Sequence, residues 1–430
     1  MKITPAHHIS GEVRLPGDKS ISHRAAMLAA IAQGKTSITN YATSADCAST
    51  LDCLARLGLD ISRDGTSVTM AGTGKYGLRA PVHDLDCGNS GTTMRLISGI
   101  LAGQPFATTL TGDESLSRRP MRRIIAPLSL MGASIRSHED HAPLTITGQR
   151  PLKPISYQTP VASAQIKSCV LLAGLYADGG TTVIESTPTR DHTERMLQWF
   201  GVAVDRRSEA DGQAITVNGS AILSAKDFIV PGDISAAAFF MVAAACLPGS
   251  DIAMHRVGMN STRSAICDVL RDLGVDIDVS ETREVCNEPV ADLRVRGGIV
   301  ANQSTAVISG DTIANLIDEV PIIAVLGTQL TGGLEVRGAG ELRVKETDRI
   351  GAVCTNLKAM GATVTEYEDG FSVERSDLKG AVVDSFGDHR IAMAFAIAGL
   401  LAEGETEILG AECAAVSFPD FFQTLRGVVR

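Results

Sequence analysis

Charged and hydrogen-bonding residues gather at the starts of several segments that we expect to be helices of small residues. A helix N-terminus presents unpaired N–H groups and a partial positive charge, so it attracts anions. Arginine adds a planar fork that binds two oxygens of a carboxylate or phosphate at once. The groups are Asp18-Lys19-Ser20 with Arg24, Gly88-Asn89-Ser90-Gly91-Thr92-Thr93 with Arg95, Ser163-Ala164-Gln165 with Lys167, and Asp388-His389-Arg390. This pattern predicts a site for anionic small molecules.

Three more charged runs lie between these helix starts. They are SLSRRPMRRI (Arg118, Arg119, Arg122, Arg123), TPTRDHTER (Arg190, Asp191, His192) and ELRVKETDR (Lys345, Glu346, Asp348, Arg349). Any one of them could be a solvated salt-bridge network, and for a single cluster that is the interpretation we favour. The run from Gly88 to Thr93 could likewise be a turn with capping residues. The repeated association with helix starts favours anion binding for the set.

Asp318 stands in ANLIDEVPIIAV, where an apolar helix is expected to begin. It could be the N-cap of that helix. A carboxylate beside an apolar helix that faces a cationic site could equally serve as a general base. Both interpretations stay open on spacing alone.

Two other motifs carry no assigned chemistry. His138 and His141 have H-x-x-H spacing, but they lie in the polar stretch SHEDHAPL, so we assign no metal to them. The run AGTGKYG (71–77) lacks the spacing of a phosphate-binding loop and is expected to be a turn. PGDKS fails the same test.

Composition narrows the class of protein. The chain has 430 residues, 44% hydrophobic and 4% aromatic, and a formal net charge of −10, which argues against nucleic acid as the main partner. Nine scattered cysteines without a C-x-x-C pair indicate reduced thiols, with no disulfide framework and no zinc site. The N-terminus lacks a signal-peptide pattern, and no run of 18 apolar residues occurs. We therefore expect a cytoplasmic protein without a membrane partner.

The elements that must position these residues repeat along the chain. The pattern Leu-x-x-x-Gly, then a small or branched residue, x, and Ile or Val predicts a helix end, a Gly C-cap and a strand start. It occurs as LARLGLDI (54–61), LSLMGASI (128–135), LQWFGVAV (197–204), LRDLGVDI (270–277) and LKAMGATV (357–364), with a degraded copy, FFQTLRGV, near the C-terminus. A small-residue helix followed by Gly and a β-rich segment alternates with it six times.

Six units of about 72 residues (430 divided by six) therefore fill the chain. PGDKSISHRAAMLAA at Pro16 also resembles PGDISAAAFFMVAAA at Pro231, an offset of 215 residues (231 minus 16), which suggests duplication of a half. The predicted fold class is α/β: two similar domains of three βαβαββ-type repeats each, with helices buried inside and sheets outside.

Eight motifs, in order between residues 15 and 400, resemble the successive signatures of the EPSP synthase family of enolpyruvyl transferases. They are LPGDKSISHRAA, CGNSGTTMRL, LTGDESLSRRP, ASAQIKS, TRDHTER, LIDEVP, RVKETDR and GDHRIAMAFA. The resemblance implies an inside-out α/β barrel in each domain and two chain crossovers, near Lys19 and Pro231. The implied domains are 20–230 and 1–19 plus 231–430, which close on the substrates.

The family's reaction moves the enolpyruvyl group of phosphoenolpyruvate to the 5-hydroxyl of shikimate 3-phosphate and releases phosphate. The resemblance implies Asp318, Glu346 and Lys19 as catalytic residues, without a metal or organic cofactor. The implied ligands of shikimate 3-phosphate are Lys19, Ser20, Arg24, Ser163, Ala164, Gln165, Arg190, Asp318 and Lys345. Those of phosphoenolpyruvate are Lys19, Asn89, Gly91, Arg119, Gln165, Arg349 and Arg390.

The chain departs from the family pattern at two positions. Val416, in AAVSFPDFF, replaces a lysine that many members carry, and Arg190 stands where some have tyrosine. Both features resemble the branch that includes glyphosate-tolerant enzymes. Gly91, where alanine blocks glyphosate in that branch, is still glycine, so glyphosate sensitivity stays open.

Two other functions compete with this prediction. UDP-N-acetylglucosamine enolpyruvyl transferase shares the fold, but its family has a Lys-Asn start and a loop cysteine, whereas this chain has Lys19-Ser20 and no cysteine in SLSRRPMRR. A non-catalytic anion-binding scaffold predicts loss of charged groups, yet Lys19, Asp318 and Arg349 are all present. We expect a monomeric enzyme whose partners are its small-molecule substrates.

Overall fold

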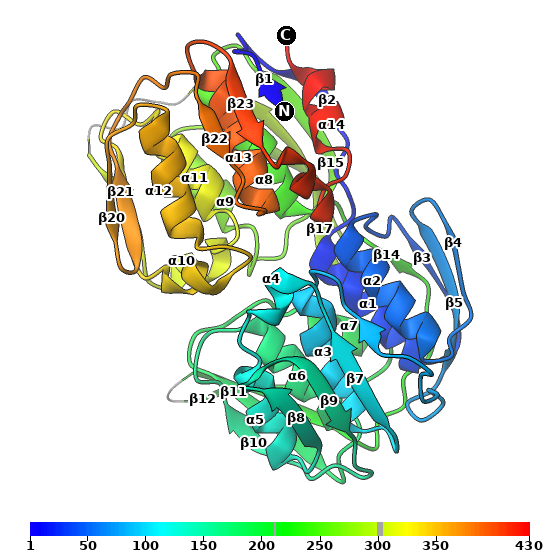
Figure 1. Ribbon diagram of the computed structural model, residues 1–430. Helices are drawn as coiled ribbons and strands as arrows, with labels where there is room; N and C mark the ends of the chain where they lie inside the picture. Colours follow the sequence, from blue (N-terminus) through cyan, green and yellow to red (C-terminus); the bar gives the residue numbers. More distant parts are fainter. Residues whose placement is uncertain (210–211, 299–303) are drawn as a thin grey trace. The chain divides into compact units, whose positions relative to one another are not determined.

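The computed structural model describes residues 1–209, 212–298 and 304–430, and it is an α/β protein (Figure 1). These residues form two compact units. Unit 1 comprises Met1–Pro16, Pro231–Glu284 and Pro289–Arg430, and unit 2 comprises Gly17–Val230 and Val285–Glu288. No sequence pattern predicts that the short stretch 285–288 belongs to unit 2. The predicted three-repeat domains, 20–230 and 1–19 plus 231–430, stay a prediction.

Unit 2 contains three four-stranded sheets of one topology within the described residues. In each, the first two strands are parallel and the following pairs are antiparallel. The sheets are β14 (Phe228–Ile229), β3 (Gln33–Thr39), β5 (Ser67–Thr73), β4 (Ile61–Asp64); β6 (Leu85–Asp86), β7 (Ala107–Thr111), β9 (His141–Thr147), β8 (Ser134–His138); and β10 (Ser156–Gln158), β11 (Gly180–Glu185), β13 (Gly212–Asn218), β12 (Val204–Glu209).

The sheets of unit 1 follow the same order: a parallel pair, then an antiparallel neighbour. They are β2 (Ser10–Val13), β15 (Asp251–Gly258), β17 (Glu288–Arg296), β16 (Asp276–Val285); β18 (Ala306–Ile308), β19 (Leu334–Val336), β21 (Gly370–Val373), β20 (Val364–Tyr367); and β22 (Val382–Asp384), β23 (Thr406–Leu409), β1 (Lys2–Ile3). The N-terminal strands β1 and β2 thus complete two sheets of unit 1.

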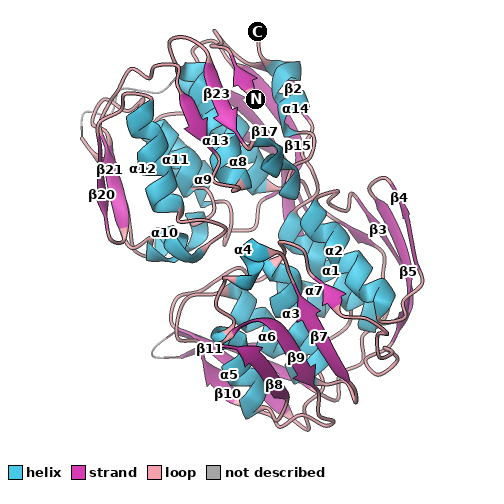
Figure 2. Cartoon of the chain, viewed as in Figure 1, coloured by secondary structure: helices cyan, strands magenta, loops and turns pink. Residues whose placement is uncertain are grey.

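Six helices form the interior of the two units, three in each (Figure 2). They are α1 (Lys19–Ile31), α3 (Gly91–Ala102), α6 (Ala164–Gly174), α8 (Ile234–Cys246), α11 (Val320–Gly327) and α13 (His389–Leu401). Small residues allow these helices to approach closely: a Cβ on Gly99 of α3 would lie 2.2 Å from the carbonyl oxygen of Cys169 in α6. The prediction of helices inside and sheets outside is confirmed.

The Leu-x-x-x-Gly pattern ends five of the outer helices. These helices are α2 (Ala45–Arg56), α5 (Arg122–Leu130), α7 (His192–Trp199), α9 (Ala265–Asp272) and α12 (Arg349–Ala359). After α2, Gly58 has a φ of +95°, its N–H donates to the Ala55 carbonyl, and the Leu59 N–H donates to the Leu54 carbonyl. This is a Schellman motif, in which the leucine is buried and the left-handed position favours glycine.

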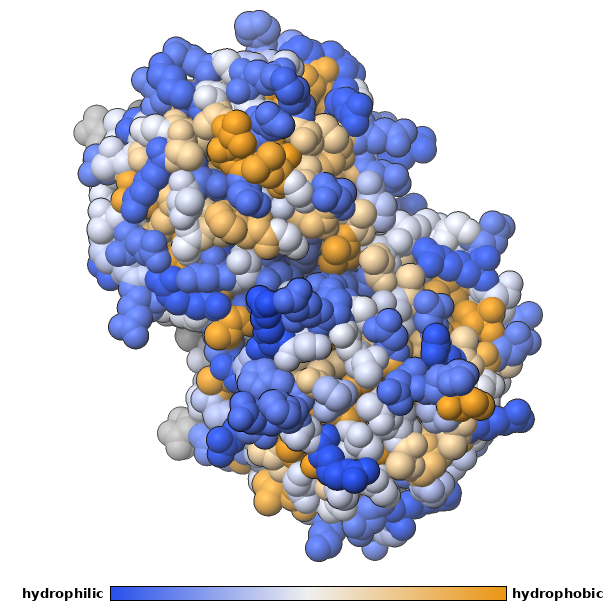
Figure 3. All heavy atoms as spheres, in the orientation of Figure 1, coloured by the Kyte–Doolittle hydropathy of each residue, from blue (hydrophilic) through white to orange (hydrophobic). Residues whose placement is uncertain are grey.

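The same two hydrogen bonds recur after the other four helices, at Gly132, Gly201, Gly274 and Gly361. The degraded sixth copy behaves differently, because Gly427 lies inside α14 (Phe421–Val428) and does not end it. Within the described residues, the short helices are α4 (Glu114–Ser117), α10 (Asp311–Leu316) and the 3-10 helices η1 (Gly340–Val344) and η2 (Ala411–Val416). In the described parts of the chain no helix is long and apolar enough to cross a membrane. Hydrophilic residues predominate on the face in Figure 3.

Candidate functional site

The inner helices of unit 2 begin at capped N-termini that carry most of the predicted site residues. The Asp18 carboxylate caps α1 by accepting from the Ile21 N–H, and the Ser90 and Ser163 hydroxyls cap α3 and α6 in the same way. Ser90 therefore confirms that the run from Gly88 to Thr93 contains a capping residue. Each cap satisfies only part of the helix end, so the positive end of the helix dipole remains available to an anion.

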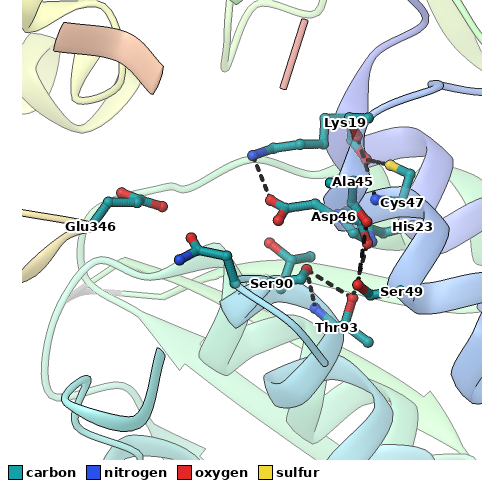
Figure 4. Close-up of polar contacts among 12 residues, drawn as sticks. Lys19, His23, Ala45, Asp46, Cys47, Ser49, Ser90, Thr93 and Glu346 are labelled. Carbon is teal, nitrogen blue, oxygen red and sulfur yellow. Dashed lines mark hydrogen bonds and ion pairs between the residues drawn. The ribbon is translucent and has the colours of Figure 1, made fainter. Parts of the chain in front are cut away.

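Lys19, the first residue of α1, forms an ion pair within unit 2 (Figure 4). Its Nζ lies 2.8 Å from Oδ2 of Asp46, in the first turn of α2, and the Lys19 side chain is 17% exposed. The Cys47 thiol contacts the Lys19 carbonyl. Sequence reasoning missed Asp46, because a carboxylate in a first turn is an ordinary helix-start residue. The pairing fixes the direction of the Lys19 ammonium.

A chain of buried hydrogen bonds lies beneath Lys19 and joins α1, α2 and α3. His23 Nδ1 is 2.6 Å from the Thr50 hydroxyl, which is 2.7 Å from the Thr93 hydroxyl, which in turn is 2.8 Å from that of Ser90. Burial lowers the pKa of His23 well below its usual value, and the charges of Lys19 and Arg24 lower it further. The His23 side chain is therefore buried, hydrogen-bonded and uncharged.

Arg24 of α1 lies almost fully buried at the junction with α6 and α7. Its Nε donates to the Thr193 hydroxyl at 2.8 Å, one Nη to the Ser168 hydroxyl at 2.8 Å, and the other to the Ser20 carbonyl at 2.9 Å. Burial lowers the pKa of Arg24 to about 10; Glu194 opposes this shift and Arg190 adds to it. The structure thus brings Arg24 close to half-buried Arg190.

Arg119 is held by the loop that precedes α3. One Nη donates to Oδ1 of Asn89 at 2.8 Å and to the Ser115 hydroxyl at 3.1 Å, while the other donates to the Asn89 carbonyl. Asn89 is itself fixed, because its Nδ2 donates to Asp113. The side chains of Asn89 and Arg119 are therefore held together by hydrogen bonds beside Gly91. A Cβ on Gly91 would lie 3.4 Å from Arg119 Nη1.

Gln165, in the first turn of α6, contacts the first turn of α3. Its Oε1 accepts from Arg95 Nη1 and its Nε2 donates to the Thr92 hydroxyl, both at 2.9 Å. Ser20, Ser163 and Ala164 are half-buried at the same helix starts.

Lys167 does not belong with these cations, although its position in the sequence suggested that it would. It is buried, and its Nζ lies 3.1 Å from Glu185 and 2.8 Å from Glu194. Lys167 therefore pairs with buried carboxylates inside unit 2 and does not face a ligand.

In unit 1, Arg349 at the start of α12 binds three carboxylates. Its Nε lies 2.7 Å from Asp388, one Nη lies 2.7 Å from Glu346, and the other lies 3.4 Å from Asp318. The Arg349 side chain is 1% exposed. Burial opposes the charge on Arg349, but the three carboxylates outweigh burial and raise its pKa above the usual value. This cluster is therefore a buried ion network, not the solvated one that the charge run allowed.

Asp318 is surrounded by four cations from three segments of unit 1. Its carboxylate lies 3.4 Å from Arg349, 3.7 Å from Arg390, 3.7 Å from Arg263 and 4.0 Å from Lys345. Arg390 also donates to the Asp318 carbonyl at 2.9 Å. The N-cap of α11 is Glu319 and it makes no capping hydrogen bond with its side chain, so the N-cap interpretation of Asp318 is wrong.

Sequence reasoning also missed Arg263. It is buried, donates to the Ser235 hydroxyl at 2.5 Å, and lies 3.6 Å from Asp233 at the N-terminus of α8. The Ser235 hydroxyl in turn contacts Glu319. Nothing in NSTRSA marks this arginine, because its partners are distant in the sequence.

Other charged residues of the same runs are solvated pairs, as the alternative interpretation allows. Arg118 pairs with Glu114, and both side chains are exposed. Arg343, which is 27% exposed, pairs with Asp348 and Glu366. His138 is exposed in the β8–β9 hairpin. Among the described residues no group of three or more His, Cys, Asp and Glu could hold a metal ion, and all nine cysteines are free thiols.

The run 71–77 lies near the other ends of the inner helices. Lys75 Nζ donates to the carbonyls of Leu175, which follows α6, and of Gly219. A cavity of about 340 Å³ lies there, lined by Lys75, Tyr76, Ile31 and their neighbours. Ile31 ends α1, which Lys19 begins, so this cavity is separate from the residues that are predicted to bind anions.

Comparison with known proteins gives one consistent result. The model of the EPSP synthase (3-phosphoshikimate 1-carboxyvinyltransferase) family matches residues 3–425. The chain is 49% identical over 429 residues to the 3-phosphoshikimate 1-carboxyvinyltransferase of Solibacter usitatus (strain Ellin6076), with 99% of both chains covered. It is 51% identical over 432 residues to that of Salinibacter ruber (strain DSM 13855 / M31), covering 99% and 98%. A solved structure of EPSP synthase from Acinetobacter baumannii matches with a TM-score of 0.87 and 41% identity, covering 100% and 98%.

Proposed function

The chain belongs to the EPSP synthase family, and from that premise we propose how its two charged clusters perform the family's reaction. The reaction transfers the enolpyruvyl group of phosphoenolpyruvate to the 5-hydroxyl of shikimate 3-phosphate and releases phosphate. This transferase activity, a step of the shikimate pathway to chorismate and the aromatic amino acids, is the function predicted from the sequence. The observation that carries the proposal is that one buried arginine, Arg349, binds both Asp318 and Glu346.

Unit 2 supplies most of the proposed contacts to shikimate 3-phosphate. Three of the five N–H groups of Arg24 donate to protein oxygens, so two stay available to a ligand. The proposed ligands beside it are Lys19, Ser20, Ser163, Ala164, Gln165 and Arg190, with Asp318 and Lys345 contributed by unit 1. Cations and capped helix starts suit a ligand that carries both a phosphate and a carboxylate on one ring.

Phosphoenolpyruvate carries both a phosphate and a carboxylate, so it needs several cations. We assign Lys19, Asn89, Gly91, Arg119 and Gln165 from unit 2. Unit 1 adds Arg349 and Arg390. Held by these groups, the substrate has its anionic ends fixed, and positioning supplies much of the catalysis.

The proton transfers fall to Asp318 and Glu346. In the addition step the 5-hydroxyl oxygen bonds to C2 of phosphoenolpyruvate, one carboxyl group takes the hydroxyl proton, and the methylene carbon gains a proton from an acid. In the elimination step the bond from C2 to the phosphate oxygen breaks and the methyl group returns a proton. Two carboxyl groups in different surroundings can divide this work. The Lys19 ammonium stabilises negative charge at the reacting oxygens.

We also propose that the protein acts in the cytoplasm as a monomer. The nine free thiols support a reducing compartment. Sedimentation at micromolar concentration would check the monomer, which a dimer mass would contradict.

A phosphate-release assay tests the function. Phosphate should appear only when phosphoenolpyruvate and shikimate 3-phosphate are both present. Release with UDP-N-acetylglucosamine instead would indicate the sister enzyme. Tight anion binding without turnover would indicate a scaffold.

A further inference from the structure

We propose that Arg95 is a positioning residue for Gln165, and that residue 91 is glycine because the Arg95 guanidinium passes directly over it. The inference deepens the proposed function, since it rests on Gln165 as a proposed ligand of both substrates. It concerns contacts within unit 2 only. Three observations carry it.

The first observation is the fixed orientation of the Gln165 amide. Arg95 Nη1 donates to Oε1 and Nε2 donates to Thr92, both at 2.9 Å. A charged donor makes the Oε1 bond the stronger of the two. With the oxygen turned toward α3, the second N–H of the amide is left to donate to a ligand oxygen.

The second observation is that Arg95 also connects to the Arg119 segment. Its other Nη donates to the carbonyl of Pro120, the residue after Arg119, at 3.3 Å. One guanidinium thus joins α3, α6 and the segment that presents Arg119. Movement of Arg95 would disturb two proposed contacts to phosphoenolpyruvate at once.

The third observation concerns the space at Gly91. A Cβ there would lie 2.6 Å from Arg95 Nη1, the same nitrogen that donates to Gln165. Gly91 is not among the glycines with positive φ, so its backbone conformation does not exclude alanine. The side chain of Arg95, rather than the backbone, is what requires glycine at this position. Because the end of an arginine is flexible, a methyl group would displace it from Gln165 rather than unfold the helix.

A double-mutant cycle tests the proposal. Gly91→Ala should raise the KM for phosphoenolpyruvate about tenfold, the value of one charged hydrogen bond, with a smaller change in kcat. In an Arg95→Met background the same alanine should raise KM less than about twofold, because the clash is gone. Arg95→Lys keeps one donor on a flexible stem, so Gly91→Ala/Arg95→Lys should regain most of the lost affinity.

Additive effects of Gly91→Ala and Arg95→Met would overturn the proposal, because the methyl group would then act on something other than Arg95. Gly427→Ala, where a Cβ meets no atom within 4 Å, is the matched control and should leave KM unchanged. A crystal structure of Gly91→Ala gives a readout that does not depend on turnover. Separation of Arg95 from Gln165 beyond 3.5 Å supports the proposal, and retention of the contact contradicts it. Absence of phosphate release by the unmodified enzyme would instead contradict the proposed function.

Discussion

The charged clusters of the two units differ in the groups that their arginines bind. In unit 2, Arg24 and Arg119 donate hydrogen bonds to uncharged hydroxyl, carbonyl and amide oxygens. In unit 1, Arg349 binds three carboxylates. The first arrangement suits the binding of anionic substrates, whereas the second holds carboxylates for proton transfer. We therefore propose that unit 2 supplies most of the contacts to shikimate 3-phosphate, and that unit 1 supplies the carboxylates for proton transfer together with Arg349 and Arg390 for phosphoenolpyruvate.

The largest expected effect is on the acid–base side. Asp318→Asn removes a proton acceptor but keeps the shape of the side chain, so kcat should fall by a factor on the order of 10² to 10⁴. Steady-state kinetics would measure it. Asp420→Asn, at an exposed aspartate of the same unit, should leave kcat unchanged. Equal rates for Asp318→Asn and the unmodified enzyme would remove the catalytic role of unit 1.

The next effect is on stability, and it compares buried with exposed ion pairs. Arg349→Met leaves Asp388, which is 0% exposed, without its strongest counter-charge, so the free energy of unfolding should fall by about 3 to 5 kcal/mol at neutral pH. Urea denaturation would measure the loss. Arg294→Met breaks only a surface pair with Asp251 and should leave the midpoint unchanged. Similar midpoints for both variants would show that the unit 1 cluster is not held by buried charge.

A smaller effect tests whether the buried His23 side chain of unit 2 is uncharged. The pKa of His23 in the folded protein lies well below 6.5. As pH falls through 6.5, His23 therefore takes up a proton in the unfolded chain but stays neutral in the folded chain. Stability should then fall by up to about 1.4 kcal/mol per pH unit until the lowered pKa is reached.

In His23→Asn this part of the slope should disappear, as denaturation at several pH values would show. His138→Asn, at an exposed histidine, should keep the slope of the unmodified protein. An unchanged slope in His23→Asn would mean that the folded protein charges this histidine normally.

The sequence could predict those features that depend on residues close together along the chain. The Schellman leucines and glycines, such as Leu54 and Gly58, are set by neighbours within six residues, so the repeats and the inside-out arrangement were predictable. Pairings across elements were not. Asp46 binds Lys19, 27 positions away, and Arg95 binds Gln165, 70 positions away, so neither pairing leaves a local pattern.

Lys167 shows the opposite error. Its position near a helix start matched the anion-binding pattern, but helix rotation turns its side chain toward Glu185 and Glu194. Spacing along the sequence identifies a helix start, and the side-chain direction around the helix decides whether a cation faces a ligand or the core.

The central claim is that unit 2 binds shikimate 3-phosphate and unit 1 supplies the carboxylates for proton transfer. Calorimetric measurement of the binding of shikimate 3-phosphate alone to two single variants tests this claim most directly. Arg190→Met, in unit 2, should weaken binding at least about tenfold, because a charged contact to the ligand is lost. Glu346→Gln, in unit 1, should bind within about twofold of the unmodified enzyme while it loses most of its turnover. Normal binding by Arg190→Met together with weak binding by Glu346→Gln would contradict the account.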